Sequence, residues 1–343
     1  MLNRTNGIFL LVVVFLCVPG ASLSVLYAQG RRGPQQQQPT EAARDVLGAL
    51  RYRYIGPVGN RLTAVAGVPG QPNIYYVGAA SGGLFKTIDG GVHWDPVFDD
   101  QPVSSIGSLA IAPSDSNVIW AGTGEAWIRS HISVGQGIYK STDAGKTWTL
   151  MGLEKTGRIG RIIVHPANSE IVYVCALGRA TGPQQERGVY RTLDGGTNWQ
   201  RVLFVNENTG CSGISISAED PKVLVAGTWE VVMHTWAMFS GGDGSGVYVS
   251  RDSGSTWKRM SDGLPRSPVG KIDVAVAPSN GKRVYALIQT PDQGSLWRSD
   301  DGGTKWKVVS WDRSLIGRAG YYIRVDVNPQ NDLEVLVANS RFH

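Results

Sequence analysis

Five aspartates recur in the motif Ser/Thr-x-Asp-x-Gly-x-x-Trp, called the box below, and a repeated carboxylate is a candidate for acid–base chemistry. The Asp and Trp of the five boxes are Asp89 and Trp94, Asp143 and Trp148, Asp194 and Trp199, Asp252 and Trp257, and Asp301 and Trp306. An Asp in a tight turn can accept hydrogen bonds from nearby amides, and the Gly permits the positive φ that such turns need. The Trp can cover the turn with its ring. We expect the boxes to be structural, because five carboxylates spread around a fold cannot converge on one substrate.

The spacing of the boxes indicates the elements that hold them. The box tryptophans follow one another at intervals of 54, 51, 58 and 49 residues. Each unit also contains an alternating segment that ends near a proline and is followed by a short apolar run, as in RIIVHPANSEIVYVC. Enrichment in Val, Ile and Tyr between turn residues favours strands, and four short strands per repeat are typical of a propeller blade. The sequence predicts an all-β fold, a β-propeller of four-stranded blades with five complete repeats and a truncated sixth.

The N-terminus has the layout of an export signal. Residues 1–28 are predicted to be a signal peptide, and residues 29–49 a flexible leader rich in Gln and Pro. The apolar block of the signal, Ile8 to Val18, is shorter than the roughly 20 residues that span a membrane, so no transmembrane segment is expected. We expect residues 50–343 to form the propeller, in the periplasm, at the cell surface or outside the cell. Because the sixth repeat stops at NSRFH before its box, we also expect the chain to be part of a longer propeller.

Composition excludes several kinds of chemistry. The net charge is +5, from 33 Lys and Arg against 28 Asp and Glu, but the basic residues are scattered, so no nucleic-acid partner is expected. The five histidines have no metal-ligand spacing, and no phosphate-binding glycine loop or nucleophile elbow is present. We therefore expect no metal and no cofactor. Cys175 and Cys211 end one predicted strand and begin another, and we expect them to be buried free thiols, although they could approach each other.

The candidate binding residues lie in the long loops between second and third strands and at the starts of first strands. Long loops on a rigid scaffold often carry function. The candidates are Arg61, Trp127, Arg129, Arg158, Arg161, Trp229, His234 and Trp236. The rings could stack on sugars or hold apolar peptide side chains, and the guanidinium groups could hold a carboxylate or phosphate. Alternatively, the rings pack the loops down and the arginines pair with acidic neighbours such as Asp273.

Glu125 and Glu230 occupy equivalent positions in two repeats and could in principle form the pair of carboxyl groups of a glycosidase. Two glycosidase carboxyl groups stand about 5 to 9.5 Å apart. A whole blade separates these two residues, which puts them roughly 15 Å apart or more, because sheets pack about 10 Å apart. We expect each to cap local backbone or pair with an Arg, and we assign no catalytic residue.

The boxes resemble the BNR or Asp-box repeats of sialidases, plant-polysaccharide hydrolases and sortilin-type receptors. The span from Arg51 to His343, with YIGPVGNRL, GTGEAW, KTGRIGRIIVHP and NENTG, most closely resembles secreted bacterial proteins with a sortilin N-terminal-like propeller, often called glycosyl hydrolases. The sialidase motif Phe/Tyr-Arg-Ile-Pro is missing from RYIGP. Xyloglucan hydrolases carry an Asp in a Thr-Asp-Ile-Gly-Gly segment, where this chain has Ala80.

From these observations we predict an exported propeller that acts as an interaction module and binds a peptide, a protein or a carbohydrate. The alternative is a glycoside hydrolase, similar to sialidases or xyloglucanases, whose catalytic carboxylates lie partly outside this chain.

Overall fold

The structure, a computed structural model, describes residues 61–129 and 132–343. The expected signal peptide, the leader and the first residues of the propeller lie outside these ranges. Within them the chain forms β-strands and two short 3-10 helices, η1 (Glu154–Thr156) and η2 (Arg313–Ile316). None of the helices in the described ranges is long and apolar enough to cross a membrane.

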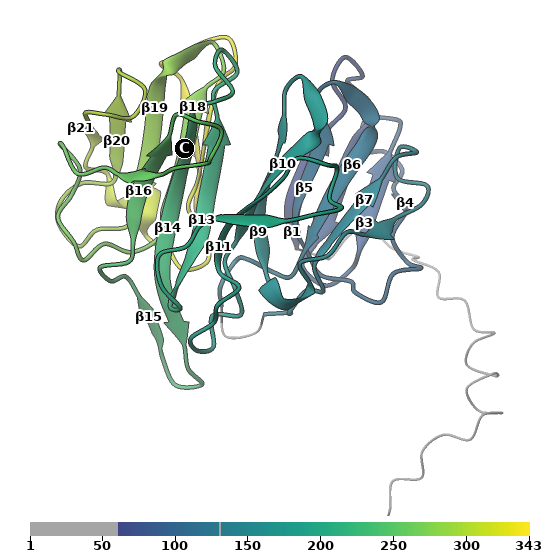
Figure 1. Cartoon of the computed structure of the whole chain (residues 1–343), viewed down its shortest axis with the longest axis horizontal. Coiled ribbons are helices and arrows are strands. Elements are labelled where there is room, and N and C mark those ends of the chain that lie inside the picture. The colour runs from purple at the N-terminus through teal and green to yellow at the C-terminus, as the bar shows by residue number, and fades with distance from the viewer. Residues whose placement is uncertain (1–60, 130–131) are drawn as a thin grey trace, which may run out of the picture. The chain divides into compact units, whose positions relative to one another are not determined.

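Five antiparallel sheets, each built on a meander of four strands, follow one another along the chain (Figure 1). The first three sheets comprise β1 (Leu62–Gly67), β2 (Tyr75–Ala79), β3 (Leu84–Thr87) and β4 (Asp95–Pro96); β5 (Ile106–Ala112), β6 (Asp115–Thr123), β7 (Ile138–Ser141) and β8 (Thr149–Leu150); and β9 (Ile159–His165), β10 (Asn168–Ala176), β11 (Gly188–Thr192) and β12 (Gln200–Leu203). The next two comprise β13 (Thr209–Ile216), β14 (Leu224–Met233), β16 (Gly246–Ser250) and β17 (Lys258–Arg259); and β18 (Ile272–Ala277), β19 (Asn280–Ile288), β20 (Leu296–Ser299) and β21 (Lys307–Ser310).

Two further pairings complete the topology. A short strand, β15 (Met238–Ser240), extends β14 into a hairpin beyond the fourth sheet, and β22 (Arg324–Val327) pairs with β23 (Val335–Ala338) as a two-stranded sixth sheet. The fold is therefore an all-β propeller with five four-stranded blades and a two-stranded sheet. This confirms the fold class and the repeat count that the box spacing predicts.

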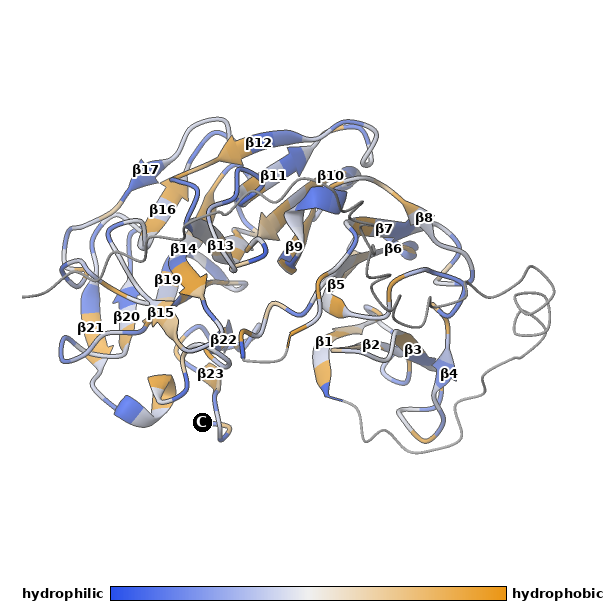
Figure 2. Ribbon diagram, turned by 90° about the horizontal axis from the view of Figure 1, so that it is seen from below, coloured by the Kyte–Doolittle hydropathy of each residue, from blue (hydrophilic) through white to orange (hydrophobic). Residues whose placement is uncertain are grey.

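The hydrophobic core lies between successive sheets. One cluster packs Leu84 of the first blade against Ile119 of the second, and another packs Trp120 of the second against Val174 of the third. Similar clusters join the later sheets in order, and the hydrophobic colour in Figure 2 concentrates on the strands. The second to fifth blades thus bury both faces against neighbouring sheets, whereas β1 of the first blade exposes Leu62 and Val65.

The boxes fasten the hairpins between the third and fourth strands of each blade. Asp143 accepts hydrogen bonds through Oδ1 from the amides of Lys146 (3.0 Å) and Thr147 (2.9 Å), and through Oδ2 from the Thr147 hydroxyl (2.7 Å). The hydrogen bonds from the hydroxyl and the backbone amide of Thr147 lower the pKa of Asp143 to about 2. Gly145, two residues after the Asp, has a φ of 82°. In this box the Asp side chain therefore accepts its hydrogen bonds from its own hairpin.

The box tryptophans divide into two groups. Trp94, Trp257 and Trp306 donate Nε1–H to a glycine carbonyl of their own turn, as expected. Trp148 and Trp199 instead donate to carbonyls at the ends of the preceding blades, those of Val97 (2.8 Å) and Met151 (2.7 Å). Two boxes therefore connect neighbouring blades as well as closing a hairpin.

Replacing Asp143 with Ala should lower the melting temperature by a few degrees and leave binding functions intact, because two turn amides and the hydroxyls of Ser141 and Thr147 lose their acceptor. Thr142→Ala is the matched control, since Thr142 is an exposed neighbour in the same turn. Thermal unfolding followed by circular dichroism would check this. Equal melting temperatures for the two variants would show that the box does not stabilise the hairpin.

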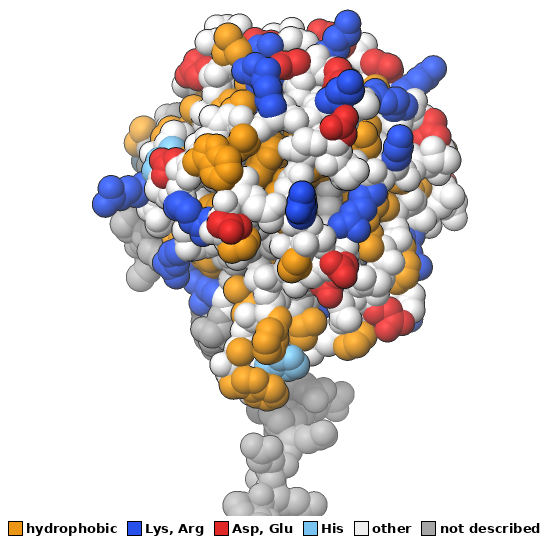
Figure 3. Space-filling model, turned by 90° about the vertical axis from the view of Figure 1, so that its left-hand side faces the viewer, with side chains coloured by type: hydrophobic (Ala, Val, Ile, Leu, Met, Phe, Trp, Pro, Cys, Tyr) orange, Lys and Arg blue, Asp and Glu red, His pale blue; other side chains and the backbone are white. Residues whose placement is uncertain are grey.

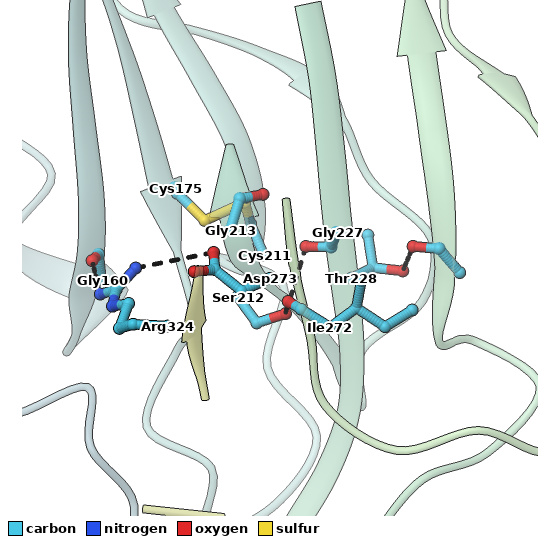
Figure 4. The surroundings of a disulfide bond; sticks show 11 residues. Gly160, Cys175, Cys211, Ser212, Gly213, Gly227, Thr228, Ile272, Asp273 and Arg324 are labelled. Carbon is cyan, nitrogen blue, oxygen red and sulfur yellow. Dashed lines mark hydrogen bonds and ion pairs between the residues drawn. A yellow bond between two sulfur atoms is a disulfide. The ribbon is translucent and has the colours of Figure 1, made fainter. Parts of the chain in front are cut away.

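Cys175 and Cys211 form a disulfide, so the expectation of free thiols is wrong (Figure 4). Cys175 lies in β10 and Cys211 in β13, and both are fully buried in the core between the third and fourth blades. The meander places the end of the second strand of one blade beside the start of the first strand of the next. Their Cα atoms are 5.0 Å apart, a normal separation for a disulfide. The bond links two blades covalently.

Candidate functional site

The long loops and the box hairpins lie at opposite ends of the blades. In a four-stranded antiparallel meander, the second connection leaves from the end opposite to the third, and the boxes occupy the third. The long second connections follow β6, β10 and β14. The first strands of the blades also begin at this end, called the loop face below. The candidate binding residues are therefore placed on one face.

A cavity of about 630 Å³ opens among the first strands, and we call it the inner-strand cavity. Strands β1, β5, β9 and β22 contribute its walls, together with Trp127 from the loop after β6. The first strands can approach closely because small residues face one another. A Cβ on Gly107 of β5 would lie 2.4 Å from the Ile159 carbonyl oxygen of β9. The volume falls within the range of about 300 to 1,000 Å³ typical of ligand sites.

Trp127 brings several segments together at this cavity. Its Nε1–H donates to the Thr63 carbonyl at 3.1 Å, which ties the loop after β6 to β1. The guanidinium of Arg324 lies 4.9 Å from the centroid of its ring, and the ring of Tyr321 is 6.1 Å away. Cations over an indole face are stabilised by its quadrupole. The role of Trp127 in the structure is to hold Arg324 at the wall of the cavity.

Lys271 lies behind this wall, where it is 5% exposed. Its Nζ donates to the Tyr322 carbonyl at 2.8 Å and lies 5.3 Å from the rings of both Trp127 and Trp229. Burial lowers the pKa of Lys271 to about 7, and the positive charge of Arg324 adds to this effect. Sequence reasoning missed this residue. The repeat could have identified Lys271, because Gly270-Lys271-Ile272 matches Gly157-Arg158-Ile159, which stands at the start of another first strand.

Two arginines from different blades meet at the cavity. Arg161 of β9 donates to Asp326 of β22 at 3.0 Å. Arg324 of β22 donates to the Gly160 carbonyl at 2.7 Å and has its Nη1 3.7 Å from Oδ1 of Asp273 (Figure 4). The arginines thus pair with acidic neighbours, Asp273 among them, as the alternative interpretation expected. The same contacts place both guanidinium groups in the lining of the cavity.

Glu125 and Glu230 are engaged locally, as expected from their positions. Glu125 is fully buried and accepts two hydrogen bonds from Arg129, at 2.9 and 3.2 Å. Arg61 lies 3.8 Å from the same carboxylate. Glu230 accepts the amide of Gly244 at 2.8 Å and so caps the loop after β15. Glu125 is therefore paired with arginine, and Glu230 with local backbone, which are the two roles expected for these residues.

Two of the candidate residues support the loops from within. Arg158 is 2% exposed, donates to the carbonyls of Gly178 and Arg179, and has its pKa lowered to about 10 by burial. Trp229 is fully buried and donates Nε1–H to the Ser240 hydroxyl at 3.0 Å. Neither side chain offers surface to a ligand. Arg158 and Trp229 thus pack the loops down, as the alternative interpretation expected, and do not contact a ligand.

The hairpin of β14 and β15 carries an exposed aromatic cluster at its tip. The ring of His234 stacks on Trp236 with centroids 4.7 Å apart and planes 11° apart, and Phe239 meets His234 edge-on at 5.6 Å. Trp236 is 78% exposed and Phe239 is 58% exposed. Figure 3 shows hydrophobic side chains gathered beside a histidine at the lower end of the molecule, where Figure 1 places β15. Large apolar side chains on a projecting hairpin are typical of a contact surface.

No protein-family model matches the chain. Among curated proteins, it is 26% identical over 251 residues to a probable oligoxyloglucan-reducing end-specific xyloglucanase of Neosartorya fischeri, covering 62% of this chain and 28% of that protein. It is 26% identical over 278 residues to a xyloglucanase of a Paenibacillus species, covering 79% of this chain and 23% of that protein. The chain thus spans about a quarter of the length of these two relatives. The crystal structure of a GH74 enzyme from Niastella koreensis matches with a TM-score of 0.60 at 21% identity, over 80% of this chain and 43% of that one, which supports the propeller fold.

Proposed function

We propose that the protein acts on a β-linked plant polysaccharide of the xyloglucan kind, as a glycoside hydrolase or as part of one. The observation that carries this proposal is the similarity to xyloglucanases, which extends over 62% and 79% of the chain in the two relatives described. The similarity favours carbohydrate over peptide as the ligand, and hydrolysis over a purely interacting role. The sortilin-like interpretation has no comparable support.

The loop face would bind the polysaccharide. The inner-strand cavity has room for sugar residues. Most of its lining is apolar, and Arg161, Arg324 and Asp326 offer hydrogen-bond partners for hydroxyl groups. The exposed ring of Trp236 offers a flat apolar surface on which a pyranose ring can stack. A chain of sugars could contact both features, because Met238 of the hairpin packs against Gly320, next to the Tyr321 that contacts Trp127.

A second candidate is glycan binding without cleavage, and one position favours it. Ala80 stands where xyloglucan hydrolases are expected to carry an Asp, and its methyl side chain is fully buried directly after β2. Asp326, the carboxylate that lines the inner-strand cavity, is paired with Arg161. Under the hydrolase proposal, the catalytic carboxylates are supplied at least partly from outside the described residues.

The experiment incubates the full-length protein with tamarind xyloglucan and measures new reducing ends over time. Release of xyloglucan oligosaccharides above a heat-inactivated blank is the result expected from the hydrolase proposal. Retarded migration in a gel containing xyloglucan, without release, would favour binding alone. Neither release nor retardation by a protein with native circular dichroism would overturn both candidates.

Trp236→Ala should weaken binding of xyloglucan oligosaccharides by about tenfold. This factor corresponds to about 1.4 kcal/mol of binding free energy, which the loss of one ring–sugar stacking contact would remove. The melting temperature should stay unchanged, because the ring is 78% exposed. Isothermal titration calorimetry gives the affinity, and Leu193→Ala, which removes an exposed apolar side chain from a box hairpin, is the control. A large loss of thermal stability with unchanged affinity would instead identify Trp236 as a packing residue.

The disulfide supports export as the proposed localisation. Disulfides form and persist in oxidising compartments, and the bond between Cys175 and Cys211 is buried in the core. We therefore propose that the protein works in the periplasm, at the cell surface or outside the cell, where a plant polysaccharide would be met. Non-reducing mass spectrometry of the natural protein would detect the disulfide.

A further inference from the structure

The walls of the inner-strand cavity carry an excess of positive charge. The charged side chains that line it are Arg161, Arg324 and Asp326, which sum to a formal charge of +1. Behind the wall, Asp273 lies 3.7 Å from Arg324, and Lys271 contacts the Trp127 ring from within. Because the pKa of Lys271 is about 7, these five groups together carry a formal charge between 0 and +1 near neutral pH. The excess of positive charge therefore belongs to the groups of the lining itself, where an anionic ligand would meet two guanidinium groups and one carboxylate.

Arg161 is the group best placed to meet such an anion. A guanidinium has five N–H donors, and among the described residues Arg161 uses one Nη2–H bond, to Asp326. Its side chain is 24% exposed, and that of Asp326 is 62% exposed, so the pair lies at the accessible side of the cavity. The remaining donors can form a paired hydrogen bond to a carboxylate, which is the geometry that arginine favours.

Arg324 is held in place for the same task. Its Nη2–H bond to the Gly160 carbonyl fixes it one residue from Arg161, and the Trp127 ring lies under its guanidinium. Asp273 and Asp326 favour the charged form of both guanidinium groups, and the attraction of Arg324 to Asp273 outweighs its repulsion from Arg161. Both arginines therefore remain cationic at the cavity, where a further negative charge can meet them.

We propose that the inner-strand cavity selects glycans that carry a carboxylate, namely uronic acid residues within or on a plant polysaccharide, through Arg161 and Arg324. This inference rests on the proposed function, which supplies a plant polysaccharide as the ligand, and it adds that the cavity prefers sugars that carry a carboxylate. A peptide carboxylate could meet the same charges. The similarity to polysaccharide hydrolases favours the sugar.

The test compares two ligands that differ only in the carboxylate. The first is a xylo-oligosaccharide substituted with glucuronic acid, and the second is the same compound after reduction of its carboxyl group to an alcohol. Isothermal titration calorimetry on the full chain should give an affinity about tenfold higher for the acid, because a charge-assisted hydrogen bond is roughly twice as strong as a neutral one. Raising the ionic strength should reduce the preference.

Two variants move the preference in opposite directions. Arg161→Gln should lower the ratio of the affinity for the acid to the affinity for the reduced compound toward one. Asp326→Asn should raise this ratio, because the variant lacks the carboxylate that competes with the ligand for Arg161. Arg251→Gln, in the box hairpin of the fourth blade, is the matched control and should keep the wild-type ratio. Circular dichroism confirms that each variant is folded. The Asp326 variant keeps the test decisive if the loss of Arg161 impairs folding.

The outcomes separate this inference from the proposed function. Equal affinities for the acid and the reduced compound, with a neutral xyloglucan oligosaccharide also bound, would overturn the acidic preference and leave the proposed function standing. Failure to bind any of the three glycans would overturn both. A third outcome is that the protein binds none of the glycans but binds a short peptide with a free C-terminus more tightly than the same peptide amidated. That outcome would also overturn the inference, in favour of a peptide ligand.

Discussion

Reducing the disulfide between Cys175 and Cys211 should lower the free energy of unfolding by about 4 kcal/mol, estimated from the loop entropy of a crosslink across 36 residues. The bond joins β10 to β13, so the third and fourth blades are the ones that separate more easily without it. Urea unfolding of the unaltered chain, with and without a reducing agent, measures this loss of stability. Because reduction leaves both sulfur atoms in the core, the comparison is free of any cavity.

A variant with Cys175→Ala and Cys211→Ala supplies the control for this measurement. It should unfold at a lower urea concentration than the oxidised protein, and the reducing agent should not change its midpoint. If the oxidised and reduced proteins unfolded at the same urea concentration, the crosslink would contribute nothing to stability and the blade interface would be held by packing alone.

Lys271→Met should abolish a rise of roughly 2 kcal/mol in stability that the unaltered protein gains between about pH 7 and about pH 9. Burial holds the pKa of Lys271 at about 7 in the folded state, whereas an unfolded lysine titrates near 10.4. Between these values the unfolded chain binds the extra proton, so the free energy of unfolding increases as the pH rises. Below the folded pKa the buried charge costs its full desolvation penalty, which the variant avoids.

Urea unfolding at three pH values across that window checks the Lys271 prediction. The variant should also be more stable than the unaltered protein near neutral pH, although it gives up the hydrogen bond to the Tyr322 carbonyl. Lys258→Met is the matched control, because Lys258 is exposed in β17 and its loss should leave the pH dependence unchanged. Parallel pH dependences for the unaltered protein and Lys271→Met would mean that Lys271 does not carry this effect.

The blades could be predicted from the sequence because each box carries its own turn chemistry. Asp143 and Gly145 specify the hairpin by hydrogen bonding and by a positive φ, both local properties, and the interval between boxes then sets the strand count. The bonds from Trp148 and Trp199 to the preceding blades could not be predicted, because they depend on how adjacent sheets pack. The same limit explains the error over Cys175 and Cys211, whose separation depends on the register between two blades.

The candidate site was predicted less completely. The starts of first strands drew attention to Arg161, which the structure places in the lining of the inner-strand cavity and pairs with Asp326, as the alternative interpretation expected. Lys271 was missed because a single lysine at a strand start is usually exposed, and its burial requires segments from the second, fourth and sixth repeats. The relation to xyloglucanases is spread over the blades at 26% identity, so no single motif carried it and the sequence favoured an interaction module.

Hydrogen–deuterium exchange of the full chain with a saturating xyloglucan oligosaccharide tests most directly whether function lies on the loop face. We predict slower exchange in residues 233–239 of the hairpin and 318–324 beside the inner-strand cavity, with no change in the five box hairpins. Protection confined to the boxes, or no protection at any segment, would contradict this account.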